Sequence, residues 1–358
     1  MCRARLLSLT LIFATALPTT SAGQERPEGP PILSVEGIEL TVGGRLQTLF
    51  STTDVPGVPA SEFFLRRARL EVSLQVNEQV SGTLQPEFGG GEVSMKDAYL
   101  NLAVSPGLQV LAGKAYRPFG LIEQTSSKRI LPIERGLRIE GLAAADEYAL
   151  LSSLQYTNRD VGIQVYGEPE GAPLGLAYEV GVLAGPLNGQ IDDEHSYQFA
   201  GRVTVQPIER TRLGAGWSRR DFASFTGGST EMEAGNAFEV DLEYGAFAPG
   251  VHVLAEVSRG DLDPFEDLTF WGAHVWLAYR TEQIGPLDTF IEPLLRVSHS
   301  DVETLVAGTP GMGGTLFTPG INFYFTPLNR VAVNYDIWRG QDGGRDAKSF
   351  KAMFQFAF

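Results

Sequence analysis

Apolar and polar residues alternate with a period of two along most of this chain. Between residues 38 and 50 the even-numbered positions are mostly apolar and the odd-numbered ones mostly polar. Between residues 238 and 244 every even-numbered residue is aliphatic or aromatic and every odd-numbered residue is acidic. Successive side chains of a β-strand point to opposite faces. Each such segment therefore predicts a strand with one apolar and one polar face.

About sixteen segments show this pattern, and together they cover most of the chain. They are residues 38–50, 63–76, 80–88, 94–104, 108–115, 160–167, 176–183, 196–205, 210–222, 238–244, 251–259, 269–280, 289–299, 314–325, 330–339 and 348–358. Beyond the N-terminal region, no stretch approaches the roughly 18 to 20 apolar residues that a membrane-spanning helix needs. A helical membrane protein is therefore excluded.

The links between these segments are long at one end of the predicted sheet and mostly short at the other. The long links are 51–62, 116–159, 186–195, 223–235, 260–268, 300–313 and 340–347, and the link 89–93 is an exception to the alternation. Long loops on one rim and tight turns on the other are typical of an outer-membrane β-barrel. The alternative is a secreted β-sandwich or β-solenoid, but its second face would not carry polar residues of both charges on nearly every strand.

The two ends of the chain agree with this location. Arg3 and Arg5 precede an apolar stretch, and small residues follow it, so residues 1–22 are predicted to be a signal peptide and residues 23–358 the barrel domain. Four phenylalanines of one parity end the chain at Phe358, which resembles the signal that the barrel-assembly machinery reads. We therefore expect the outer membrane of a Gram-negative-type bacterium. The only cysteine, Cys2, offers the exported chain no disulfide and no metal thiolate.

Residues 64–136 resemble the phosphate-selective porin O and P family. The resemblance lies in the RRAR motif at 66–69, DAY at 97–99, RPFG at 117–120, TSS at 125–127 and IER at 133–135. It implies a sixteen-stranded antiparallel barrel, usually trimeric, whose third long loop folds into the lumen as a constriction. Residues 116–159 occupy the position of that loop in the chain order.

Charge is distributed unevenly along the chain. The formal net charge is −15, and it becomes −17 without the two signal-peptide arginines. Between residues 66 and 138, however, there are ten basic and seven acidic residues. In the second strand Leu70 and Leu74 must face lipid, so Arg67 and Arg69 must face the lumen. Arg66 has the lipid-side parity and is expected at the rim, where it can reach water or lipid phosphate.

These charges predict a passive diffusion channel for small hydrophilic solutes, with a preference for anions such as phosphate as the finer hypothesis. The predicted constriction and anion path consists of Arg67, Arg69, Lys128, Arg129, Arg135 and Arg138. The predicted opposing acidic wall consists of Glu239, Asp241 and Glu243. Parity adds Glu256, Glu292, Asp336, Arg202, Arg212, Arg220, Arg280 and Arg296 to the lumen. In one alternative, such charges only pair and hold the loop. In another, the barrel conducts nothing and serves adhesion or envelope anchoring.

Other functions find little support in the sequence. The four histidines, His195, His252, His274 and His299, lie in separate strands and loops, so we expect no enzyme, no cofactor and no metal site. An outer-membrane lipase or protease would need a nucleophile and a base on one face. Ser258 and His274 could both face the lumen at a similar height, but no histidine has a neighbouring serine or carboxylate at a spacing that fixes a triad. The acidic links at 191–195 and 260–267 could bridge divalent cations to lipid phosphates. The expected partners are outer-membrane lipid, lipopolysaccharide, the assembly machinery and, from the resemblance, two further copies of the chain; nucleic acid is not expected.

Overall fold

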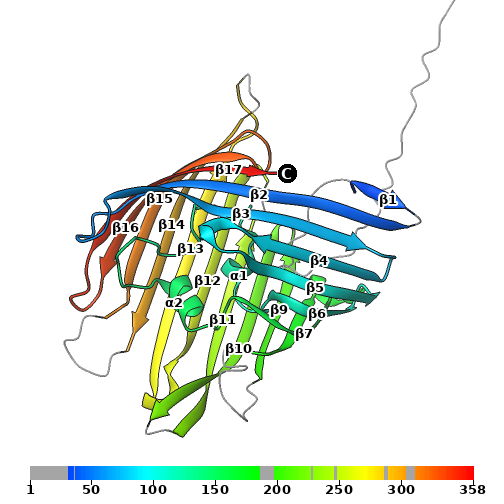
Figure 1. Ribbon diagram of the computed structural model, residues 1–358, viewed down its shortest axis with the longest axis horizontal. Helices are drawn as coiled ribbons and strands as arrows, with labels where there is room; N and C mark the ends of the chain where they lie inside the picture. The colour runs from blue at the N-terminus through cyan, green and yellow to red at the C-terminus, as the bar shows by residue number, and fades with distance from the viewer. Residues whose placement is uncertain are drawn as a thin grey trace, which may run out of the picture.

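The computed structural model describes residues 31–35, 37–185, 197–226, 229–245, 248–285, 289–303 and 311–358. Sixteen antiparallel strands, β2 to β17, close into a barrel, and a short strand, β1, is added at its edge (Figure 1). The strands are β1 (Leu33–Val35), β2 (Ile38–Thr52), β3 (Ser61–Gln75), β4 (Val80–Glu87), β5 (Ser94–Ser105), β6 (Leu108–Tyr116), β7 (Arg159–Gly167), β8 (Ala177–Leu183), β9 (Gln198–Ile208), β10 (Thr211–Thr226), β11 (Ser229–Tyr244), β12 (Gly250–Asp263), β13 (Leu268–Arg280), β14 (Phe290–Val302), β15 (Gly314–Tyr324), β16 (Arg330–Gly340) and β17 (Ala347–Ala357).

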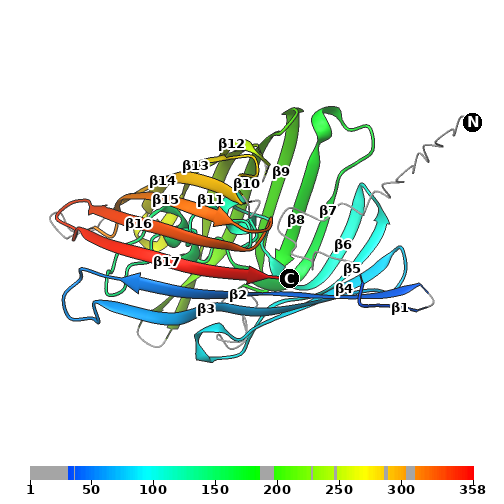
Figure 2. The same ribbon diagram turned by 90° about the horizontal axis from the view of Figure 1, so that it is seen from above.

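The barrel closes between its first and last strands, β2 and β17, which lie side by side in Figure 2. β17 pairs with β2 from Lys351 opposite Ser51 to Ala357 opposite Arg45. The first residues of β2 extend beyond the end of β17, and β1 pairs with them. β1 thereby covers backbone groups that an open strand edge would leave unpaired.

Each of the sixteen predicted segments corresponds to one barrel strand, so the predicted fold class is confirmed. Two details of the prediction were wrong. Residues 223–235 were expected to be a loop, but β10 and β11 remain paired as far as Thr226 and Ser229. The sequence shows no apolar–polar alternation in this outer part of the hairpin, because neither of its faces has to contact lipid. β1 was also not predicted, because three residues are too few to show a period.

The barrel wall has two heights (Figure 1). On one side β4, β6, β7 and β8 contain only 8, 9, 9 and 7 residues. On the other side β10, β11 and β12 contain 16, 16 and 14. At about 3.3 Å per residue and the usual tilt, these walls rise about 20 Å and about 40 Å. We call them the low wall (β4–β8) and the tall wall (β10–β13).

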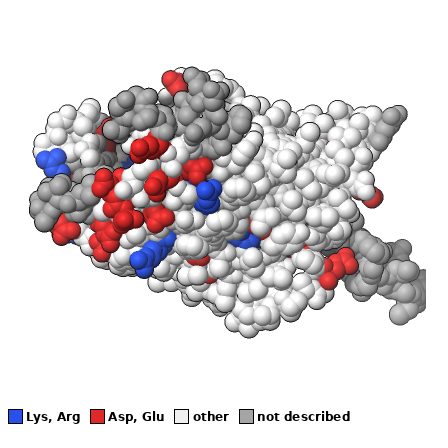
Figure 3. All heavy atoms as spheres, turned by 90° about the horizontal axis from the view of Figure 1, so that it is seen from below, with Lys and Arg blue, Asp and Glu red and all other residues white. Residues whose placement is uncertain are grey.

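The outer face of the barrel is apolar and the inner face polar. Leu100, Ile163, Val180 and Val240 are among the exposed outward residues, whereas Gln47, Asn101 and Ser298 are buried inside. On the outer face in Figure 3, acidic side chains gather at one end of the molecule beyond a largely uncharged wall. The ends of β11–β14 that carry the long links contribute exposed Glu231, Glu233, Glu266, Asp267, Asp301 and Glu303. None of the helices in the described part of the chain is long and apolar enough to cross a membrane.

The link between β6 and β7, residues 117–158, lies inside the barrel, and we call it the inner loop (Figure 1). It contains α1 (Leu121–Gln124) and α2 (Glu147–Ser153); three short 3-10 turns lie elsewhere, at Gly89–Gly91, Pro173–Gly175 and Pro264–Glu266. Its Leu150 and Tyr156 pack against Phe270 of β13, and its Ile122 and Leu131 pack against Trp276. The core of the protein is therefore the contact between this loop and the inner barrel wall. Residues 1–22 and the acidic link 191–195 lie outside the described residues.

Candidate functional site

Polar side chains of the strands bind the backbone of the inner loop. Arg296 of β14 donates to the carbonyl oxygens of Glu134 (2.8 Å) and Gly136 (3.0 Å), and Arg330 of β16 donates to that of Leu131 (3.0 Å). The carbonyl oxygens of Ser127, Lys128 and Arg138 accept from Gln47, Gln355 and Lys351 in the same way. A loop inside a lumen needs such partners, because buried carbonyl groups are costly when unpaired. The inner loop is thus fitted to this wall.

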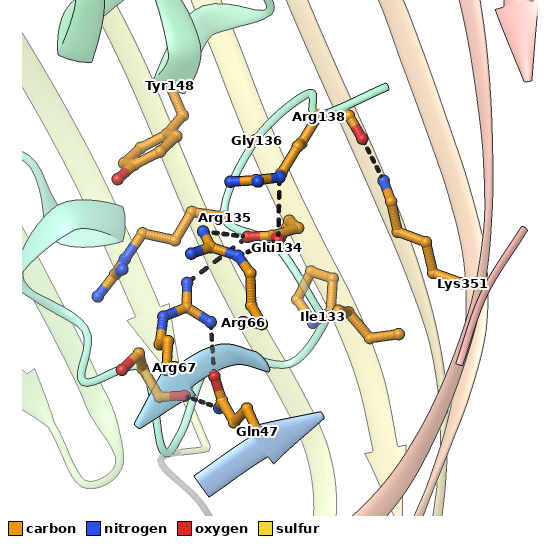
Figure 4. A network of polar contacts seen from close by, with 12 residues as sticks. Gln47, Arg66, Arg67, Ile133, Glu134, Arg135, Gly136, Arg138, Tyr148 and Lys351 are labelled. Carbon is orange, nitrogen blue, oxygen red and sulfur yellow. Dashed lines mark hydrogen bonds and ion pairs between the residues drawn. The ribbon is translucent and has the colours of Figure 1, made fainter. Parts of the chain in front are cut away.

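Glu134 is the centre of the strongest ionic contact of the loop. Its carboxylate accepts from Arg66 at 2.5 and 2.8 Å and forms ion pairs with Arg67 at 3.5 Å and Arg138 at 3.8 Å (Figure 4). Burial alone would raise the pKa of Glu134, but Arg66 and Arg67 reverse this effect and hold its pKa well below the usual range. Glu134 is therefore charged, and it links the loop to β3.

Arg66 faces the lumen, so its predicted position at the lipid rim was wrong. A β-bulge explains the difference: Gln47 of β2 pairs with Arg67 and Thr48 pairs with Leu65, which leaves Arg66 as an extra residue. Beyond the bulge the parity is reversed, and Phe63 and Leu65 face outward there. A bulge places two consecutive side chains against one partner. Both arginines can therefore reach Glu134.

A second ionic contact joins the loop to β2 and β3. Lys128 of the loop lies 2.8 Å from Glu71, which also pairs with Arg45 of β2. Arg69 lies 2.5 Å from Glu87 of β4. All of these side chains are buried to at least nine-tenths. The predicted lumen position of Arg69 is correct, but its charge is compensated by a carboxylate.

The six predicted constriction residues differ in their access to water. Arg135 is buried within the loop, where it donates to the carbonyl oxygens of Ile122 (3.0 Å) and Thr125 (2.6 Å). Arg129 is exposed, and the Arg138 side chain is 48% exposed. Together with the four buried cations Arg67, Arg69, Lys128 and Arg135, these two form one basic sector on β3 and the loop.

A family comparison now identifies this architecture. The model of the family described as phosphate-selective porin O and P matches residues 41–245, which is more than half of the chain. The chain belongs to the phosphate-selective porin O and P family. It is an outer-membrane porin channel, and its long links therefore lie on the extracellular side.

Solved structures share the porin fold at low sequence identity. An anion-selective porin from Comamonas acidovorans is 12% identical with a TM-score of 0.64, and 90% of this chain covers 100% of that one. OmpF of Salmonella typhi in complex with daunomycin is 13% identical with a TM-score of 0.61, covering 90% and 99%. OmpT of Vibrio cholerae in trimer form is 13% identical with a TM-score of 0.59, covering 90% and 100%. A search of curated protein sequences found no match.

Opposite the basic sector, the porin carries an acidic sector. Glu239 and Asp241 of β11 lie beside Arg202 of β9, at 3.3 and 2.5 Å, and Asp241 pairs across the sheet with Glu256 of β12. Glu243, the third predicted member, lies apart from them at the periplasmic end, where it pairs with Arg212 at 3.4 Å. Carboxylates outnumber cations in this sector, which is the reverse of the basic sector.

Helix α2 of the inner loop adds a further carboxylate to the acidic sector. The hydroxyl of Ser258 donates to Glu147 at 2.6 Å, and Glu256 of β12 is a further close neighbour of the Glu147 carboxyl group. Gly272 of β13 makes this approach possible, because a Cβ atom there would lie 2.5 Å from the Glu147 side chain. Burial raises the pKa of Glu147 to about 7, and the neighbouring charge of Asp146 adds to the effect.

Ser258 and His274 both contact the inner loop. The sequence had placed both on the lumen side at a similar height. Ser258 donates to Glu147, and the Nε2 atom of His274 accepts from Trp276 at 2.6 Å while its Nδ1 atom lies 3.7 Å from Glu147. Ser258 and His274 therefore help to hold α2. No group of three metal-binding side chains occurs within the described residues.

Sequence reasoning missed several side chains that contact the basic sector or the inner loop. Glu134 stands inside the IER motif, and Arg45 and Gln47 have the lumen parity of β2, so a signal existed for these three. No such signal existed for Glu147. The inner loop has no periodic pattern, and the contact between Glu147 and Ser258 joins residues 111 positions apart.

Proposed function

We propose that the porin is a passive diffusion channel for small hydrophilic solutes and that its inner loop forms the constriction. The basic sector stands on one side of the loop and the acidic sector on the other, which sets up a field across the lumen. The observation that carries the proposal is the presence of two water-accessible cations, Arg129 and Arg138, on the loop itself. An anion in transit can meet these two, whereas Arg67, Arg69, Lys128 and Arg135 act mainly by holding the loop.

Arg138→Gln tests the anion preference. The substitution removes an accessible cation and leaves Glu134 paired with Arg66 and Arg67, so the reversal potential in a salt gradient should shift toward cation selectivity. Arg129→Gln combined with it should increase the shift. Arg345→Gln is the matched control, because Arg345 is exposed in the turn between β16 and β17. Equal reversal potentials for all variants would show that these arginines do not line the solute path.

The paired charges also bear on the second hypothesis, a barrel that conducts nothing and anchors the envelope. Four of the six predicted cations are buried, and apolar residues such as Leu131 and Trp276 fill part of the lumen. The family favours conduction, and a folded protein without channel activity would favour the anchor.

The low wall supports assembly into a homotrimer. Four of its five strands, β4, β6, β7 and β8, rise about 20 Å. This is less than the apolar band of about 25 Å, so lipid alone would not cover this side well. A neighbouring copy of the chain would cover it. OmpT of Vibrio cholerae, which has the same fold, is known in a trimer form.

A charged residue on the low wall should therefore release monomers. Ile163→Arg places a cation on the outward face of β7, where Ile163 is exposed in the isolated chain. Native electrophoresis of refolded protein should then report a monomer. Val240→Arg on the tall wall is the control and should leave the trimer intact. A trimer in both variants would mean that the interface lies elsewhere.

A further inference from the structure

A row of outward-facing residues crosses strands β10 to β14. Trp217, Phe238, Arg259, Trp271 and Asp301 are direct neighbours on β10 to β14, each paired with the next across the sheet. Three of the five are aromatic and exposed. Exposed aromatic residues mark the boundary between hydrocarbon and headgroups in outer-membrane barrels.

The height of Arg259 agrees with that boundary. Below it on β12, the outward residues Val251, Val253, Ala255 and Val257 are all apolar. Arg259 follows Val251 by eight positions, which is a rise of about 20 Å at the usual tilt and places it near the top of an apolar band of about 25 Å. The cation therefore lies on the extracellular side, at the level of the phosphates of the outer leaflet.

Arg259 has no ion-pair or hydrogen-bond partner among the residues that the structure describes. Another cation on this face, Arg219 of β10, is by contrast paired, at 3.4 Å from Asp221. A guanidinium at a lipid boundary matches a phosphate well, because its planar donors bind two oxygen atoms at once. Arg259 is thus a free anion-binding group on the lipid-facing surface.

A depression of about 270 Å³ lies beside this guanidinium. It is lined by Arg259, Thr269, Phe270, Trp271, Asp301 and Glu303. The carboxylate of Asp301 accepts from the Trp271 indole at 3.1 Å, and that of Glu303 accepts from the backbone of Thr269 at 2.7 Å. Each carboxylate keeps a further oxygen for another donor. Such oxygens accept hydrogen bonds from sugar hydroxyls, and an exposed indole face packs against a sugar ring.

We propose that this depression, the Arg259 site, binds the headgroup of a phosphorylated glycolipid of the outer leaflet. Arg259 takes the phosphate, Trp271 packs against the sugar, and Asp301 and Glu303 accept its hydroxyl groups. The combination favours a phosphosugar over a plain phospholipid headgroup, because a sugar supplies several hydroxyl donors and a ring face beside the phosphate. The inference uses the outer-membrane location and not the selectivity or conduction of the channel.

Native mass spectrometry of the delipidated, full-length protein tests the site, with purified lipid A as the probe. Arg259→Gln should weaken binding by about tenfold or more, the usual effect of losing a charged hydrogen bond. Arg259→Lys should keep part of the affinity. Arg219→Gln, on the same face one strand beyond Phe238, should bind like the unchanged protein. The heat-dependent shift in gel mobility confirms that each variant is a folded barrel.

Three results would overturn the assignment. Equal loss in the Arg219 and Arg259 variants would indicate a diffuse effect of surface charge. Unchanged binding by Arg259→Gln would place the lipid elsewhere. Displacement of lipid A by millimolar inorganic phosphate would mean that the site recognises the phosphate alone and not a phosphosugar. Equal binding of phosphatidylglycerol would mean the same. Channel conductance of the variants should be unchanged, which separates this site from the proposed solute path.

Discussion

Glu134→Gln is expected to release the inner loop from β3 and to give a larger and noisier channel. The substitution keeps the shape of the side chain but removes the only anion shared by Arg66, Arg67 and Arg138. Removing one partner of a buried ion pair typically costs about 3–5 kcal/mol, because the remaining charges are left without compensation. Here three cations would repel one another in one place. Single-channel recordings of refolded protein should show higher mean conductance, more rapid fluctuations and stronger anion selectivity.

Glu140→Gln is the matched control for this variant. Glu140 lies six residues further along the same loop, and its side chain is exposed. It should leave conductance unchanged, although it removes the same formal charge. If both variants behave alike, or if Glu134→Gln conducts like the unchanged protein, then the ionic contact to β3 does not hold the loop.

Raising the pH from 5 to 9 is expected to loosen the other attachment of the loop, at α2. Burial raises the pKa of Glu147 from its ordinary value to about 7, so the folded state binds this proton more tightly than the unfolded chain does. The stabilisation is therefore complete below about pH 4.5 and is lost as the pH rises through about 7, and it amounts to about 3 kcal/mol. The groups that face Glu147 are Ser258, Glu256 and His274 of the wall and Asp146 of its own helix. Above that pH, Glu147 would be charged in a buried position beside Asp146 and Glu256.

Glu147→Gln should remove this dependence. A glutamine keeps the contacts to Ser258 and Glu256 without a titrating proton, so the loop should remain attached at alkaline pH. Conductance measured at pH 5, 7 and 9 should rise with pH for the unchanged protein and stay nearly level for the variant. An equal rise in both would assign the pH effect to other lumen charges.

The barrel was predictable from the sequence because lipid imposes a simple rule on every strand. An arginine that faces lipid at mid-membrane costs about 2–4 kcal/mol. The alternation is therefore strict wherever a strand crosses the membrane. The rule fails where its physical cause is absent. The outer part of the β10–β11 hairpin leaves the membrane, and the bulge at Arg66 shifts the parity without altering the composition.

The site was less predictable than the barrel. Parity correctly assigned Arg67, Arg69, Glu239 and Asp241 to the lumen, because that assignment again depends on lipid. It could not show that Glu134 and Glu71 hold most of the cations, since those contacts join a non-periodic loop to distant strands. The role of the six basic residues as an anion path stays a prediction, and Arg129 and Arg138 are its strongest members.

The central claim is that the inner loop narrows this barrel without closing it. Single-channel recording of the unchanged, refolded protein in a planar bilayer under a salt gradient tests it most directly. The account predicts discrete conductance steps with an anion-leaning reversal potential, and larger steps when residues 121–154 are replaced by a short glycine-rich turn. Folded protein that gives no steps, while the shortened variant conducts, would contradict the claim and make the inner loop a plug.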